Sequence, residues 1–208
     1  MLRKLLTAIL LSLFSLSASY GQTAQTTQNA AGKYTDYRRD GAPMPPLVFM
    51  SYTDTTTEAR ALRTIKKYRK MGMDTTYTVL TEKDFDNGAN LFVMMFNPTC
   101  LHCEDATFML EKNIDLFKKS KIILLANKVM ADYIPDFSER HHIAHLPPMY
   151  IGLDSSGFID NAYLYQALPQ INIYGPDRTL LKIYSGDVPM DSLAQYIDHG
   201  KKGKRRRR

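Results

Sequence analysis

Both cysteines of this 208-residue chain, Cys100 and Cys103, lie in the segment Asn97–Glu104 with two residues between them. Two thiols at this spacing can close a disulfide and open it again with little motion. A loop so short constrains the unfolded chain only weakly, so a bridge here would contribute little as a structural staple. The spacing therefore predicts a redox pair, in which Cys100 is the nucleophile and Cys103 is the resolving thiol.

A strand and a helix are predicted to position this pair. The run Leu91–Phe96 is apolar and of strand length, and apolar residues recur at near-helical spacing through Glu104–Lys119. Cys100 then lies just ahead of a helix, where unpaired backbone N–H groups and the positive end of the helix dipole favour an anion. This position favours the thiolate, which is the nucleophilic form of cysteine.

Two ionisable neighbours are candidates to assist the thiols. His102 is predicted to stabilise the Cys100 thiolate through its charge or its ring N–H, and Glu104 is a candidate for proton transfer. A more stable reduced form makes a stronger oxidant, and His102 favours that form. The residues alone leave the direction of the reaction open.

Metal binding is the alternative chemistry for the same cysteines. With His141, His142 and His145 they could hold Zn²⁺ or Cu(I), as a metal-binding or carrier protein would. However, the cysteine pair supplies only two of the four ligands of a structural site, and the histidine spacing is not a standard ligand set. We therefore expect no metal, and expect surface histidines that interact with the negative end of a helix dipole.

The N-terminal residues 1–21 have the pattern of a secretory signal. Arg3 and Lys4 precede the apolar run Leu5–Leu16, which is too short to span a membrane, and small residues surround a cleavage point before Gln22. The sequence therefore predicts an exported protein, periplasmic in a bacterium, with an uncleaved membrane anchor as the alternative. Residues 22–46 are rich in Gln, Thr, Ala, Gly and Pro and predict a flexible spacer.

The formal net charge of +6 comes from the two ends of the chain. Residues 200–208, a predicted disordered tail, carry seven basic side chains, and the signal carries two more. The rest is slightly acidic, so no nucleic-acid binding is expected. The tail suits an anionic membrane surface or an acidic partner.

The remaining pattern is that of an α/β protein. The run Ile122–Ala126 is continuously apolar, which is expected of a strand covered on both faces. Pro135 is expected to break or kink the helix predicted at Val129–His141. Further strands are predicted at Leu47–Tyr52, Tyr77–Leu80, Lys121–Ala126, Met149–Leu153, Gln170–Tyr174 and Leu180–Tyr184, and further helices at Thr55–Met71, Val129–His141, Ile159–Gln166 and Asp191–Asp198.

The order strand, Cys-x-x-Cys, helix, strand, helix, proline, hairpin, helix resembles the thioredoxin fold from about residue 78 to 198. Pro169 looks like the cis-proline of that family, with Pro147-Pro148 as a rival, and Gly186 has a counterpart there. The segment His145–Ala167 is similar to the central insertion of exported TlpA/ResA-like proteins. The resemblance implies a three-layer α/β fold with a central mixed sheet, an N-terminal extension and that insertion, in a domain spanning 47–199.

The same resemblance implies a thiol–disulfide oxidoreductase that acts on exported proteins. Its partners would be protein thiols or disulfides and an upstream redox partner, and the Cys100–Cys103 disulfide would serve without a cofactor. Thr99, Leu168 and Pro169 would bind substrate, with the Leu168 backbone pairing to an extended chain. Thr99 replaces a tryptophan of thioredoxin, and Met94 replaces its buried acid, so proton handling must come from elsewhere.

Overall fold

The computed structural model describes residues 35–53, 77–162 and 167–197. The predicted signal, the helix expected at Thr55–Met71 and the basic tail lie outside these residues, as does most of the spacer. Within the described ranges, every helix is too short or too polar to cross a membrane.

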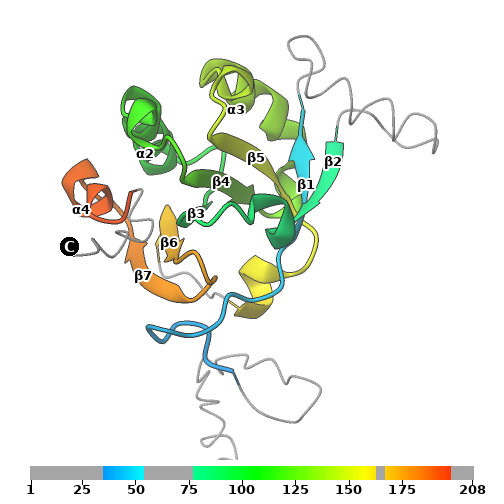
Figure 1. Cartoon of the computed structure of the whole chain (residues 1–208). Coiled ribbons are helices and arrows are strands. Elements are labelled where there is room, and N and C mark those ends of the chain that lie inside the picture. Colours follow the sequence, from blue (N-terminus) through cyan, green and yellow to red (C-terminus); the bar gives the residue numbers. More distant parts are fainter. Residues whose placement is uncertain (1–34, 54–76, 163–166, 198–208) are drawn as a thin grey trace, which may run out of the picture.

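A seven-stranded mixed sheet forms the centre of the molecule (Figure 1), in the order β2-β1-β5-β4-β3-β6-β7. The central strands β3, β4 and β5 are parallel, and the pairings on either side of them are antiparallel. All seven predicted strands are confirmed to within one residue at each end. Their bounds are β1 Val48–Tyr52, β2 Tyr77–Thr81, β3 Leu91–Met95, β4 Lys121–Ala126, β5 Met149–Asp154, β6 Gln170–Tyr174 and β7 Leu180–Ser185.

Among the described residues, three α-helices cover one face of this sheet: α2 (Leu101–Lys112), α3 (Ile134–Arg140) and α4 (Met190–Ala194). The chain passes from β3 to β4 to β5 in one direction across the sheet, and α2 and α3 form the two crossovers. Because such crossovers are right-handed, both helices must lie on the same face. The first turn of α2 therefore lies beside α3.

The central strands are buried on both faces, which is why they read as continuous apolar runs. Alternate residues of β4 separate cleanly, with Ile122 and Leu124 under the helices and Ile123 and Leu125 on the opposite face. That opposite face is covered by η5 (Phe158–Ala162), a π-helical turn, and by the segment that precedes β1. The three-layer α/β arrangement is thus confirmed.

The predicted helix bounds need correction. The helix expected at Glu104–Lys119 begins at Leu101 and ends at Lys112, and a 3₁₀ turn, η2 (Ile114–Leu116), follows it. The helix expected at Val129–His141 is two pieces, the 3₁₀ helix η3 (Lys128–Tyr133) and then α3. Pro135 falls in the first turn of α3, where its missing N–H costs no helical hydrogen bond. The described parts of the last two predicted helices are η5 and the short α4.

The flexible spacer predicted for residues 22–46 is wrong for its last part. Gly41 N donates to Leu180 O, Leu180 N donates to Ala42 O, and Met44 N donates to Arg178 O, each at 2.8 Å. Ala42 is buried. The N-terminal extension therefore pairs with the β6–β7 hairpin instead of standing free.

Gly152 allows β1 and β5 to lie side by side, which leads to a prediction about stability. A Cβ at this position would lie 2.2 Å from the backbone oxygen of Met50, a contact that only backbone movement could relieve. Gly152→Ala should therefore lower the free energy of unfolding by about 2–3 kcal/mol. Urea titration checks this, with Gly88→Ala as the control for backbone strain alone, because a Cβ there meets nothing within 4 Å and only the left-handed φ of 71° opposes it. Gly152→Ala should be the less stable of the two. A Gly152→Ala protein no less stable than Gly88→Ala would contradict the prediction.

Candidate active site

The cysteine turn is built where the buried strand β3 ends and α2 begins. Cys100 is the N-cap of α2, as predicted, with extended backbone angles of φ −96° and ψ 120°. Asn97 shapes the turn, because its backbone oxygen accepts from Cys100 N at 3.0 Å and its side-chain Oδ1 accepts from Thr99 N and Oγ1, both at 2.9 Å. The predicted substrate-binding residue Thr99 is thus an exposed, oriented part of the turn.

The two cysteines are both free thiols but differ in environment. Cys100 is partly exposed, whereas Cys103 is fully buried in the core beneath the helices. Burial raises the pKa of the Cys103 thiol to about 12; a hydrogen bond from the Asn97 backbone lowers it, and the hydrogen bond and charge of Cys100 raise it further. Cys103 is therefore protonated at neutral pH, and Cys100 is the thiol that a partner can reach.

The sheet topology brings the predicted proline to the same edge as the cysteine turn. Strand β6 runs antiparallel to β3, with Gln170 opposite Met95, so the residues before β6 lie beside the residues after β3. The Leu168–Pro169 peptide bond is cis, as expected, and the peptide bonds of Pro147 and Pro148 are not. Pro169 is buried, its oxygen accepts from Gly186 N at 2.8 Å, and Leu168 is partly exposed.

His102 has a partner that the sequence did not reveal. Its Nδ1 lies 3.0 Å from Oδ1 of Asp187, which precedes α4, and both side chains are largely exposed. The carboxylate orients the ring beside the cysteine turn. Stabilisation of the Cys100 thiolate by His102 stays a prediction.

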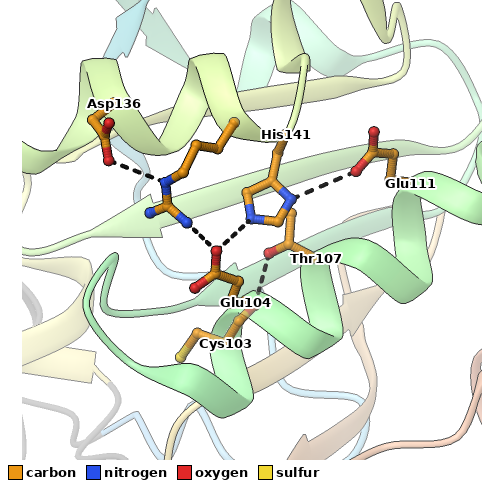
Figure 2. A network of polar contacts seen from close by, with 7 residues as sticks. Cys103, Glu104, Thr107, Glu111, Asp136 and His141 are labelled. Carbon is orange, nitrogen blue, oxygen red and sulfur yellow. Dashed lines mark hydrogen bonds and ion pairs between the residues drawn. The ribbon is translucent and has the colours of Figure 1, made fainter.

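The Glu104 side chain points away from the Cys103 sulfur and toward α3. Figure 2 shows its carboxylate facing His141, with the Cys103 side chain directed the other way. Glu104 Oε1 accepts a hydrogen bond from Nη1 of Arg140 and lies 3.8 Å from Nε2 of His141. Proton transfer by Glu104 stays a prediction. In this geometry no direct route leads from its carboxylate to the Cys103 sulfur.

The expectation that the three histidines lie at the surface is wrong for His141. Its side chain is fully buried and packs against the tilted rings of Phe108 and Phe137, with centroids at 4.4 and 4.5 Å. Its Nδ1 lies 3.5 Å from Oε2 of Glu111. His142 and His145 are exposed, and among the described residues no three His, Cys, Asp or Glu side chains are grouped to hold a metal ion.

Buried His141 should make the stability of the fold depend on pH. Burial lowers its pKa from the ordinary value, against the opposite effects of Glu111 and Glu104. Below about pH 6.5 the unfolded chain binds a proton that the folded chain refuses, so the free energy of unfolding falls as the pH drops. The buried ring nitrogens have no hydrogen-bond partner among the described residues, so His141→Phe keeps the ring contacts and removes the titration.

The measurement is urea unfolding between pH 7.5 and 5.5. His141→Phe should change stability at pH 7.5 by within about 1 kcal/mol, and should flatten the dependence on pH. The exposed His145→Gln variant is the control and should keep the wild-type slope. An unchanged slope in His141→Phe would refute this assignment.

Two further residues shape the site without having been predicted as parts of it. Thr107 is buried, and its Oγ1 donates to the backbone oxygen of Cys103 at 2.8 Å, which ties down the first turn of α2. Met94, in the position of the acid of thioredoxin, is fully buried in the same core cluster as Cys103. The surroundings of the buried thiol on the strand side are therefore apolar.

This architecture is similar to that of several proteins of known structure. No protein-family model matches the sequence, and no curated protein is detectably similar to it. Solved structures do match: a thiol:disulfide interchange protein from Bacteroides sp. has a TM-score of 0.54 at 14% identity, with 81% of this chain and 97% of that chain covered. The thioredoxin domain of a thiol-disulfide oxidoreductase from Bacteroides vulgatus has a TM-score of 0.51 at 14% identity, covering 76% and 94%.

At these identities the likeness concerns the fold and leaves the activity to the residues of this chain. The match covers nearly all of each solved structure. The chain therefore has a thioredoxin-like fold.

Proposed function

We propose that the protein is a thiol–disulfide oxidoreductase that acts on other proteins through Cys100 and Cys103. The observation that carries the proposal is the asymmetry of the pair: one partly exposed cysteine at a helix start, and one fully buried cysteine whose pKa is raised by burial. Thiol–disulfide exchange needs one thiol that is accessible to the partner protein, and a second thiol that attacks only after the first has formed a mixed disulfide.

The reaction follows from this arrangement. The Cys100 thiolate attacks one sulfur of a partner disulfide, and the other partner sulfur leaves as a thiolate and takes up a proton. Cys103 then gives up its proton and attacks Sγ of Cys100, which releases the second partner thiol and closes the Cys100–Cys103 disulfide. Two electrons and two protons pass to the partner, and oxidation of a partner dithiol is the reverse.

Binding of the partner chain is proposed at the edge where the cysteine turn meets the start of β6. Leu168 is partly exposed there, and proline at the next position offers no N–H, so the Leu168 backbone is the group to pair with an extended segment. Thr99, which is exposed in the cysteine turn, would contact the same segment. We further propose that the protein is exported, on the basis of the signal pattern in residues 1–21.

The test is catalysis of insulin reduction by dithiothreitol, together with oxidation of a reduced peptide dithiol by the oxidised protein. The wild type should accelerate at least one of these reactions, and a protein with both cysteines replaced by serine should accelerate neither. Equal rates for the two proteins in both assays would overturn the proposal. The reduction potential then gives the direction: about −120 mV marks an oxidant and about −270 mV a reductant.

A further inference from the structure

The structure assigns to Arg140 a positioning role for the thiol pair: it holds and neutralises the Glu104 carboxylate, and thereby keeps Cys100 reactive. This inference deepens the proposed function and rests on it. It concerns a residue on α3, outside the cysteine turn, that reaches the chemistry only through Glu104.

The first step is the position of Glu104 relative to Cys100. Its backbone N–H donates to the backbone oxygen of Cys100 at 3.1 Å, so the two residues are one helical turn apart on the same side of α2. The Glu104 side chain is about three-quarters buried, with 27% exposed, which limits screening by water. A bare carboxylate here would oppose the negative charge of a Cys100 thiolate.

The second step is that Arg140 is fixed against this carboxylate. Its Nη1 donates to Glu104 Oε1, while its Nε donates to Oδ2 of Asp136 at 3.0 Å. Its guanidinium also lies over the ring of Phe137, 5.5 Å from the centroid. Three contacts thus hold the Arg140 cation against the Glu104 anion, which is 36 residues away in sequence.

The third step is that the other groups around Glu104 do not replace Arg140. His141 lies 3.8 Å from the same oxygen, beyond hydrogen-bond length, and burial favours its neutral form. The far side of that ring faces Glu111, another carboxylate (Figure 2), and Asp136 is acidic as well. Arg140 is therefore the cation that balances Glu104 among the described residues of this cluster.

The consequence is a charge effect whose sign depends on which partner is removed. Arg140→Gln leaves the Glu104 charge bare, which disfavours the thiolate. Glu104→Gln leaves the Arg140 charge bare, which favours it. When both are replaced, the net charge near Cys100 returns to that of the wild type. A role in packing alone would not produce opposite signs that cancel.

The experiment is the rate of alkylation of Cys100 by iodoacetamide in the reduced protein between pH 5 and 9, read by mass spectrometry of the Cys100 peptide. At pH 6.5, Arg140→Gln should slow the reaction about threefold and Glu104→Gln should speed it about threefold, as expected for one partly screened charge at this range. The double variant and Arg140→Lys should lie close to wild type. Both single effects should shrink in 1 M salt.

Asp136→Asn is the matched control, because it removes the other anchor of Arg140 without changing the charge next to Cys100. It should leave the alkylation profile within about 1.5-fold of wild type, since a half-exposed side chain separates the two. Profiles that coincide for all variants, or single variants that shift in the same direction, would overturn the inference. Alkylation does not require turnover, so this result stands apart from the test of the proposed function.

Discussion

Replacing Cys100 by serine should abolish thiol–disulfide exchange, with a loss of about 10³-fold or more, while the fold is retained. A serine hydroxyl is not ionised at neutral pH and cannot form a disulfide. Cys100 is the N-cap of α2 and its side chain makes no capping hydrogen bond. Serine is a preferred N-cap residue, so Cys100→Ser should unfold no more easily than the wild type and could gain up to about 1 kcal/mol.

Insulin reduction and thermal unfolding followed by circular dichroism test the two halves of this prediction on the same sample. Lys112→Gln, at the exposed far end of α2, is the matched control and should keep full activity. Activity of Cys100→Ser within tenfold of wild type would show that this thiol is not the nucleophile. Loss of the folded state in Cys100→Ser would contradict the expectation that serine is tolerated as the N-cap of α2.

Replacing Cys103 should stop turnover after the first bond has formed. Its thiol is buried, and its raised pKa keeps it protonated until Cys100 is engaged. Without it, the mixed disulfide between Cys100 and the partner has no internal thiol to resolve it, so the adduct accumulates. Catalysed turnover should fall by about 10²-fold or more, with close to one partner bound per protein.

Two substitutions keep this experiment interpretable. Cys103→Ser places a hydroxyl in an apolar cluster, at a cost of about 1–3 kcal/mol, and Cys103→Ala avoids that cost. Mass spectrometry under non-reducing conditions should show the adduct in both, and no adduct in either when Cys100 is also replaced by serine. Turnover of Cys103→Ala at the wild-type rate, with no adduct, would exclude a resolving role.

The strands could be predicted almost residue by residue, and the helices could not. The central strands are covered on both faces, so their continuous apolar runs start and stop where the strands do, as at Lys121–Ala126. The apolar periodicity after Cys103, in contrast, continues beyond Lys112 because Ile114 and Phe117 pack on the same core from a 3₁₀ turn. The predicted helix start, Glu104, is three residues too late, because the N-cap is a cysteine, which carries no capping signal.

The candidate site divides in the same way. The cysteine pair and its place ahead of a helix follow from local order along the chain, since each depends on neighbours within a few residues. The cis-proline at Pro169 was implied by the resemblance to the thioredoxin fold. The partners of Glu104 do not, because Arg140 and His141 reach it only when α3 packs against α2. The burial of His141 likewise depends on one ring from each helix, Phe108 from α2 and Phe137 from α3. The residues that flank His141 in the sequence do not distinguish it from His142, which is exposed.

Reversible formation of the Cys100–Cys103 disulfide underlies the proposed function, and a redox titration tests it directly. The protein is equilibrated in redox buffers of stepped potential, free thiols are alkylated, and the mass of the intact chain is measured by mass spectrometry. The account predicts one two-electron transition, in which Cys100 and Cys103 lose their free thiols together and regain them together when the potential is reversed. A chain in which Cys103 stays free at every potential, or in which Cys100 forms only adducts with the buffer thiol, would contradict it.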